Sequence, residues 1–239
     1  MKFSLSGFDT LSDLSGYSDG TAIGLPGSQW FIVPGLVSYF YEKNIKIYVE
    51  TLPSVYTRRR ANGIPLAIGT LNITAIPEIA ILPEPFIKDL KYADHFPFLQ
   101  DTPVLAFTEK KFADICSIKN IRASIPNPRT SYLGIIFKRY YEKNCGYFGE
   151  LKSTAILSSI PHREIPAKLM SRDIQCGIMW KSEAKYMKFK FVPVVDKPEK
   201  FSIALLKNAS SSAKFIFEEY RSGILDQYYN KFLDLIPKQ

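Results

Sequence analysis

The sequence predicts an α/β fold in which mostly parallel sheets are flanked by helices. Short segments rich in β-branched and aromatic residues alternate with longer segments whose apolar residues recur at helical spacing. The chain has 239 residues, of which 46% are hydrophobic and 14% aromatic. This composition supports a packed core, and the length suits one large domain or two lobes of about 100 to 120 residues each.

The first hundred residues predict strands and helices in alternation. Ser28 is placed to cap the first helix, which Pro34 should kink, and Pro53-Ser54 should open the second. Strands are expected at residues 2–8, 22–26, 45–51 and 78–82, and helices at 28–42, 54–61 and 65–71.

The remainder of the chain continues the same alternation. A long terminal helix is expected at 211–235, because apolar residues from Phe215 to Phe232 recur at helical spacing. Strands are expected at residues 102–110, 121–125, 191–195 and 201–208.

The segment at residues 125–134 carries the most information. A strand runs into a turn stiffened by Pro126 and Pro128, and Thr130 or Ser131 can cap the helix that follows. A capped helix N-terminus directs backbone N–H groups and the positive end of the helix dipole outward, which suits an oxyanion. An ordinary strand–turn–helix connection is the alternative interpretation.

A second motif lies about 45 residues further on, where residues 172–184 join a polar lead-in, an apolar run and a Ser-Glu-Ala helix start. Together with Asn-Pro-x-Thr-Ser-x-x-Gly at 127–134, it resembles the second lobe of type II solute-binding proteins. The resemblance is greatest to the molybdate/tungstate-binding proteins of ABC transporters. It covers residues 100–235 well and the first hundred poorly.

The resemblance implies a two-lobed fold with a two-strand hinge. The first lobe would comprise residues 1–101 with 197–239, and the second lobe residues 102–196. The hinge would lie near 101–103 and 193–200, and closure about it would bring both lobes onto one ligand.

The resemblance and the position of strand ends together select the ligand-binding residues. In parallel sheets, ligands lie beyond the carboxyl ends of the strands, where loops meet helix N-termini. The early serine turn of the family corresponds either to Ser6-Gly7 or to Gly27-Ser28. The position aligned with Trp180 often carries a tyrosine hydroxyl in the family, so tryptophan suits stacking on a flatter ligand, and a core role is the alternative. The expected ligand-binding residues are Ser28, Ser54, Asn127, Thr130, Ser131, Trp180 and Ser182.

The charge of the chain indicates which classes of partner it can bind. The formal charge of +8 favours anionic partners, yet the basic residues are scattered and carry no nucleic-acid-binding signature. We interpret Arg58-Arg59-Arg60, the densest basic run, mostly as a solvated helix face. We therefore expect a small anionic ligand, no nucleic acid, and a monomer that can pair with a membrane subunit of an ABC transporter.

Cysteine and histidine usage excludes several chemistries. The three cysteines fit neither a disulfide framework nor a zinc site, and Cys116 and Cys176 are expected to be small buried hydrophobic residues. The two histidines, His95 and His162, lie in no catalytic motif, and no P-loop, GxGxxG or HExxH sequence is present. We expect no catalytic residues, no metal and no cofactor.

The compartment depends on the start of the chain. The first residues lack the apolar stretch of a signal peptide, which predicts a cytoplasmic protein as written and an extracytoplasmic one if a leader has been removed. The leading functional hypothesis is a binding protein for an oxyanion such as molybdate or tungstate, serving an ABC-type transporter. The alternative is a cytoplasmic enzyme or ligand sensor on the same fold, acting on a small organic anion.

Overall fold

The structure is a computed structural model that describes residues 10–68, 71–109 and 114–237. The strand expected at residues 2–8, with Ser6, lies outside the described residues. Within the described ranges, no helix combines the length and the apolar character needed to cross a membrane.

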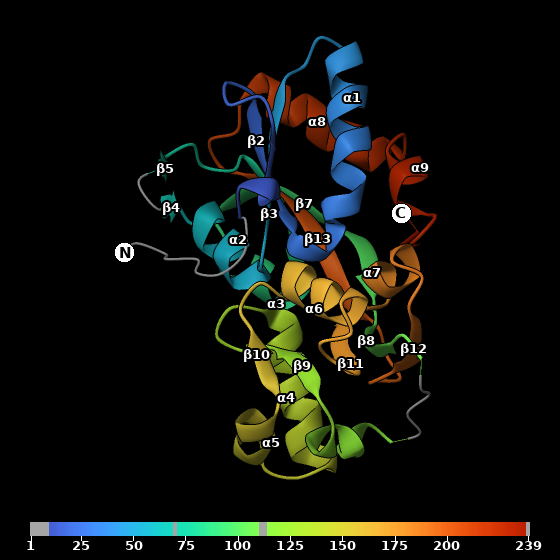
Figure 1. The fold of residues 1–239 in the computed structure, drawn as a ribbon. Coiled ribbons are helices and arrows are strands. Elements are labelled where there is room, and N and C mark those ends of the chain that lie inside the picture. Colours follow the sequence, from blue (N-terminus) through green and yellow to red (C-terminus); the bar gives the residue numbers. More distant parts are fainter. Residues whose placement is uncertain (1–9, 69–70, 110–113, 238–239) are drawn as a thin grey trace. The chain divides into compact units, whose positions relative to one another are not determined.

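The chain divides into two compact units. Unit 1 comprises residues 1–100 and 200–239, and unit 2 comprises residues 101–199. Each unit has its own sheet with helices packed against it, which confirms the expected α/β fold class (Figure 1).

The sheet of unit 1 has the strand order β1-β3-β2-β6-β13-β7-β14. Its centre is a parallel block, since β2 pairs in parallel with both β3 and β6, whereas β1, β13 and β14 pair with antiparallel neighbours. The strands are β1 (Leu14–Gly16), β2 (Thr21–Pro26), β3 (Ile47–Leu52), β6 (Ile79–Pro83), β7 (Tyr92–Asp101), β13 (Glu199–Leu206) and β14 (Asp234–Leu235).

Helices cover the sheet of unit 1. Helix α2 packs against β2, β3 and β6, while α1 contacts β3 and α8 contacts β2. Tyr39 and Lys43 of α1 both donate hydrogen bonds to the Glu219 carboxylate of α8, which ties the two helices together. The helices are η1 (Thr10–Asp13), η2 (Gly27–Ile32), α1 (Val33–Glu42), α2 (Ser54–Ala61), α3 (Glu84–Ile87), α8 (Ser211–Ser222) and α9 (Asp226–Tyr229).

Two expected helices of unit 1 differ from the prediction. The helix expected at 65–71 is wrong, because β4 (Leu66–Ile68) and β5 (Leu71–Ile73) form an antiparallel pair there. Leu66 and Ile73 are paired across that hairpin and belong to one apolar cluster with Tyr48, so burial of alternate residues decides the local structure. The terminal helix expected to reach residue 235 ends at Ser222, since Gly223 adopts a left-handed conformation with φ 86°.

The first helix of unit 1 also begins differently from the expectation. Residues Gly27–Ile32 form a 3₁₀-helix, and α1 starts only at Val33, with Pro34 in its first turn. Proline is tolerated there because the first helical N–H groups have no intrahelical partner. Pro26, not Ser28, occupies the N-cap position, and no side chain caps this helix.

The sheet of unit 2 has the strand order β10-β9-β11-β8-β12. Strands β10, β9 and β11 are parallel, and β8 and β12 extend the sheet in antiparallel fashion. The elements are β8 (Pro103–Phe107), η3 (Ile115–Asn120), β9 (Ala123–Pro126), α4 (Tyr132–Asn144), α5 (Phe148–Thr154), β10 (Ile156–Ser158), α6 (Pro161–Met170), β11 (Cys176–Trp180), α7 (Lys181–Tyr186) and β12 (Lys190–Pro193).

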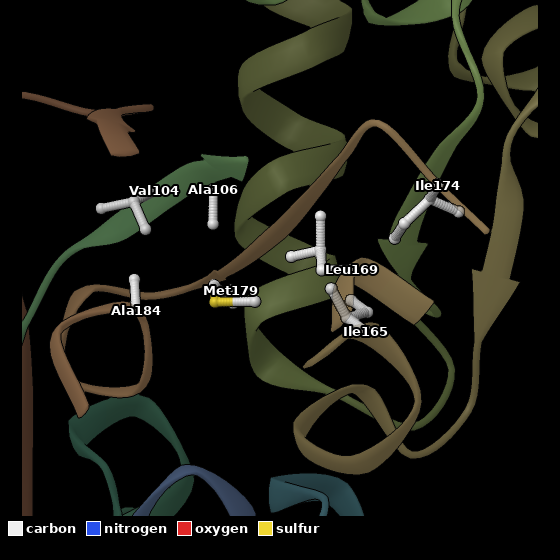
Figure 2. Close-up of a cluster of buried hydrophobic side chains, with 7 residues drawn as sticks. All are labelled: Val104, Ala106, Ile165, Leu169, Ile174, Met179 and Ala184. Carbon is white, nitrogen blue, oxygen red and sulfur yellow. The ribbon is translucent and has the colours of Figure 1, made fainter. Parts of the chain in front are cut away.

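The core of unit 2 fixes the direction of β11. Figure 2 shows Met179 of β11 among buried side chains from α6, α7 and β8. Gly177 faces the same helix, since a Cβ there would meet Ile165 of α6 at 2.4 Å. Because side chains alternate along a strand, Cys176, Ile178 and Trp180 point to the opposite face of the sheet.

The cysteines correct one expectation. Cys116 of η3 and Cys145, which follows α4, form a disulfide with a Cα–Cα distance of 5.0 Å, so Cys116 is not a free buried residue. Cys176 is free and buried, as expected. The pairing of Cys116 with Cys145 could not be inferred from a 29-residue separation that matches no cysteine motif.

Candidate functional site

The carboxyl edge of the parallel block in unit 1 collects three helix starts. Strands β2, β3 and β6 run in the same direction and lead into η2, α2 and α3. The N-cap residues are Pro26, Pro53 and Pro83, with φ from −58° to −51° and ψ from 135° to 140°. A proline therefore lies at the end of β2 and β6 and directly after β3, and the first turn of a helix follows at the same edge of the sheet.

This edge brings together the two serines expected in unit 1. Pro26 of β2 is in register with Leu52 of β3, and Ser28 and Ser54 each lie two residues beyond that pair. Ser28 is 6% exposed and Ser54 is 9% exposed. The Ser28 hydroxyl has no hydrogen-bond partner among the described residues.

Gln29 is a residue that sequence reasoning missed. Its side chain is 1% exposed, and its Oε1 atom accepts no hydrogen bond from any residue that the structure describes. A buried amide without a partner is uncommon, because its desolvation costs free energy that a hydrogen bond normally offsets. The sequence signal that could have identified Gln29 is its position at a helix start, directly before the apolar residues Trp30, Phe31 and Ile32.

Unit 2 repeats the arrangement at its own carboxyl edge. Strands β10, β9 and β11 are parallel and lead into α6, α4 and α7. Ser158 of β10 is in register with Pro126 of β9, and Gly177 of β11 with Ser124. Continuing that register places Trp180 level with Asn127. The second-lobe residues selected from the sequence therefore share one edge.

The turn after β9 is held by its own hydrogen bonds. The Asn127 carbonyl accepts from the backbone N–H groups of Thr130 and Ser131, at 3.1 and 3.0 Å. The Asn127 side-chain oxygen accepts from the N–H of Arg129 at 3.0 Å. The Thr130 hydroxyl donates to the Ser159 carbonyl at 2.9 Å. Both donors of Thr130 are thus engaged within the protein, and this residue holds the turn.

Two other donors of this turn stay available. Ser131 is the N-cap residue of α4 and is 4% exposed, but its hydroxyl makes no cap hydrogen bond. The Asn127 side-chain NH₂ group likewise has no partner in the described parts of the chain. Both groups lie at the positive end of a 13-residue helix, where an anion is favoured.

Ser182 has a different role in this structure. Its hydroxyl and its backbone N–H, the latter at 3.2 Å, both donate to the Asp101 carboxylate. Asp101 is 4% exposed and also accepts from the Thr102 N–H at 2.8 Å. Ser182 therefore anchors the start of unit 2 to the N-terminus of α7. Sequence reasoning missed this contact because the two residues are 81 positions apart.

Glu183 lies beside Trp180 and is the most strongly perturbed acid of this edge. Burial raises its pKa to about 8, and the Asp101 charge adds to the increase, while the Trp180 N–H and Arg163 oppose it. The backbone N–H of Trp180 donates to Glu183 Oε2 at 3.4 Å, and Oε1 has no partner among the described residues. Trp180 itself is 7% exposed and ends β11 on the face opposite Met179.

A glycine determines how closely α4 approaches the turn. A Cβ atom on Gly134 would lie 2.6 Å from the Pro126 oxygen, and 2.7 Å from the Asn127 carbonyl carbon and the Pro128 nitrogen. All three are backbone atoms, so the turn itself would have to shift. The glycine of the Asn-Pro-x-Thr-Ser-x-x-Gly motif therefore permits the contact that positions Asn127 and Ser131.

We expect Gly134→Ala to destabilise the protein although alanine favours helices. The helix propensity gain is about 1 kcal/mol, and overpacking against backbone costs about 1–3 kcal/mol, so a net loss should appear in urea unfolding. Gly149→Ala in α5 is the matched control, because the atoms nearest to its Cβ would belong to the exposed Tyr147 ring, which can turn away. A gain in stability for both variants would contradict the close packing of α4 on the turn.

The groups without internal partners at these two edges are neutral donors. No group of three or more His, Cys, Asp or Glu residues that could hold a metal ion occurs in the described portion of the chain. The groups without internal partners are the Ser28 hydroxyl, the Ser131 hydroxyl and the Asn127 amide. These are neutral donors at helix starts, a chemistry that stabilises an anion through oriented dipoles.

Comparisons with solved structures identify the fold. The periplasmic molybdate-binding protein of Azotobacter vinelandii matches with a TM-score of 0.69 at 12% identity, over 91% of this chain and 99% of that one. PEB3 of Campylobacter jejuni with bound L-phospholactate matches with a TM-score of 0.58 at 12% identity, over 87% and 97%. The CcmR regulatory domain of Synechocystis in complex with 2-PG gives 0.61 at 11% identity, over 83% and 94%.

These neighbours are type II solute-binding proteins, and the chain has their fold. No protein-family model matches the sequence, and no curated protein matches it. At such low identity the similarity establishes the fold, and the ligand must be inferred from the site.

Proposed function

We propose that the chain binds a small anion and delivers it as the solute-binding component of an ABC-type transporter. The observation that carries the proposal is the set of three donors without internal partners: the hydroxyls of Ser28 and Ser131 and the side-chain NH₂ of Asn127. Each lies at the carboxyl edge of a parallel block, where helices begin. Neighbours with this fold bind molybdate, L-phospholactate or 2-PG, all of them anions, which supports the same ligand class here.

The ligand would be held by neutral donors. Oriented N–H and O–H groups stabilise an anion with little reorganisation, and no full counter-charge is required. Trp180 ends β11 at the edge where a hydroxyl donor would strengthen binding of a tetrahedral oxyanion. Its ring instead favours a ligand with an organic part. Ser54, Thr130 and Ser182 shape the two edges in this proposal, and Thr130 and Ser182 do so through the hydrogen bonds described above.

The disulfide supports an extracytoplasmic location. Disulfides form and persist in oxidising compartments, whereas cytosolic proteins rarely keep them. A Cys116–Cys145 bridge within unit 2 is therefore consistent with a transport role outside the cytoplasm.

A thermal-shift panel tests the proposal. The panel contains molybdate, tungstate, sulfate, phosphate, and small carboxylates and phosphorylated metabolites. A ligand present at about 100 times its Kd should add about 2.7 kcal/mol to the stability and raise the melting temperature by several degrees. We expect the shift to disappear in the triple variant Ser28→Ala, Asn127→Ala, Ser131→Ala.

The control variant removes the same kinds of group, two hydroxyls and one amide, at positions outside the proposed site. Ser153→Ala, Asn208→Ala and Ser212→Ala together delete two hydroxyls and one amide at exposed positions and should leave the shift unchanged. A shift that persists in the Ser28, Asn127, Ser131 variant would place the ligand at other residues. A wild-type protein that responds to none of the anions would refute the anion-binding function.

Ligand sensing is the second candidate function. Its support is the similarity to a regulatory domain in complex with 2-PG, together with the aromatic Trp180 at the binding edge. A shift produced by a phosphorylated organic acid and by none of the inorganic oxyanions would favour this function over oxyanion transport.

A further inference from the structure

A groove of about 700 Å³ lies within unit 2 between α4, the start of α5 and the turn after β9. This volume falls in the range of small-molecule sites. Ile135, Phe148 and Leu157 provide an apolar wall, and the turn contributes residues 127–129. The hydroxyls of Ser28 and Ser131 do not line it, so the groove differs from the site proposed above.

The charge of the groove is strongly positive. Four cations line it, namely Arg129, Lys138, Arg139 and Lys152, against the single carboxylate of Glu142. Lys138 is within 3.7 Å of Glu142. The side chains of the other three cations have no ion pair or hydrogen bond with any described residue. Like charges gathered in a concave surface repel one another and focus the field on an incoming anion.

An aromatic platform lies at the same groove. Tyr147 is 70% exposed although it lines the pocket. A Cβ atom on Gly149 would lie only 2.4 Å from Tyr147 Cε1, so the ring rests directly on the glycine. Because Gly149 has no side chain, the Tyr147 ring packs against the glycine on one side, and the rest of the ring stays open to a ligand.

We propose that this groove binds a nucleotide-like molecule, a flat aromatic ring carrying a di- or triphosphate. Arginine forks match phosphate oxygens in two-pronged hydrogen bonds, which Arg129 and Arg139 can supply, and Lys152 adds a point charge. The Tyr147 ring offers stacking to the base. A simple oxyanion would satisfy the cations but would leave the ring and the apolar wall unused.

Titration calorimetry of the full chain with ATP, tripolyphosphate and adenosine, at about 150 mM salt to screen non-specific attraction, tests the proposal. We expect ATP to bind at least about fivefold more tightly than tripolyphosphate, because stacking on an aromatic ring contributes about 1–3 kcal/mol per base. Adenosine should bind much more weakly than ATP. Tyr147→Ala should reduce ATP affinity to that of tripolyphosphate.

Two charge variants separate a site from general attraction. Arg139→Ala with Lys152→Ala should weaken ATP binding at least about tenfold, since hydrogen bonds to charged groups are the strong ones. Lys143→Ala with Lys190→Ala removes the same charge from exposed positions of unit 2 outside the groove and should change the affinity by less than about threefold.

The other outcomes overturn the proposal. They are no ATP binding by the wild-type protein, equal losses in the two charge variants, or a Tyr147→Ala variant that still prefers ATP over tripolyphosphate. The single variants Ser28→Ala and Ser131→Ala distinguish the two sites, because neither residue lines the groove. Loss of ATP binding in Ser28→Ala or Ser131→Ala alone would assign ATP to the first site and refute the groove.

Discussion

Arg60→Ala is expected to lower the free energy of unfolding by about 3–5 kcal/mol, because it leaves a buried carboxylate without its partner. Arg60 is 0% exposed and Glu50 is 1% exposed. Nη2 of Arg60 lies 2.6 Å from Glu50 Oε1, and Nε lies 2.9 Å from Oε2, in a two-pronged pair. The loss is a large share of a typical total stability of about 5–15 kcal/mol.

The same guanidinium also holds the hairpin of β4 and β5. It donates to the carbonyls of Ile64 and Ile73, at 3.0 and 3.1 Å, and to that of Ala75. Removing it leaves these carbonyls as well as Glu50 without a donor, and each buried unpaired group costs free energy. Urea unfolding followed by circular dichroism measures the sum.

Arg58→Ala is the matched control on the same helix. Arg58 pairs with Asp89 at 2.8 Å, but this pair is exposed to solvent, so its loss should cost less than about 1 kcal/mol. The double variant Glu50→Gln, Arg60→Met should recover much of the loss, because no buried charge remains. Equal costs for Arg58→Ala and Arg60→Ala would contradict the burial of Arg60.

The pH dependence of the single variant follows from the pKa of Glu50. Burial raises this pKa above its usual value, and Arg60 opposes the increase. Without Arg60 the pKa rises further, so folding penalises the ionised carboxylate. The penalty is full above the folded-state pKa and disappears as the pH falls below the unfolded-state value of 4.5. The difference in stability between Arg60→Ala and wild type should therefore be largest near pH 8 and shrink towards pH 4.

Arg60 also shows where sequence reasoning reached its limit. Three adjacent arginines on a helix point in three directions, and the sequence predicted a mostly solvated face. The prediction is wrong for Arg60, because its acid lies ten positions earlier on a buried strand. Its carbonyl partners, Ile64, Ile73 and Ala75, lie on or beside the hairpin of β4 and β5, which the sequence did not predict. Long-range pairing of a buried charge leaves no local pattern.

The strand–helix alternation was predictable because it depends on local features. Proline and glycine positions and β-branched segments located β2, β3, β6, β9 and α2 closely. The hairpin of β4 and β5 could not be predicted, because its strands are short and their conformation depends on burial against the rest of the unit.

The candidate site residues were selected from the sequence by their positions alone. Strand ends and helix starts selected Ser28, Asn127 and Ser131, whose donors have no internal partners in the described residues. Which donors are already engaged could not be predicted. The Thr130 hydroxyl donates to the carbonyl of Ser159, which follows another strand. The Ser182 hydroxyl donates to the carboxylate of Asp101, 81 residues away.

Removing the Cys116–Cys145 disulfide should cost unit 2 about 3.5 kcal/mol. The two cysteines are 29 residues apart, and the loss of loop-closure entropy in the unfolded chain gives this magnitude for a loop of that length. We expect the Cys116→Ser, Cys145→Ser variant and the wild type under reducing conditions to unfold at the same, lower urea concentration. Reductant should then lower the urea concentration at which the wild type unfolds and leave that of the Cys116→Ser, Cys145→Ser variant unchanged.

Thiol counting decides whether the bond exists at all, and with it the argument about compartment. Native protein should show no reactive thiol, because Cys176 is buried and burial raises its pKa to about 12. Unfolded, unreduced protein should show one reactive thiol, and reduced protein three. Three thiols in unfolded, unreduced protein purified from its native compartment would mean that the bridge does not form there. In that event the support for an extracytoplasmic transport role is lost, and sensing inside the cell becomes the better explanation of the same fold.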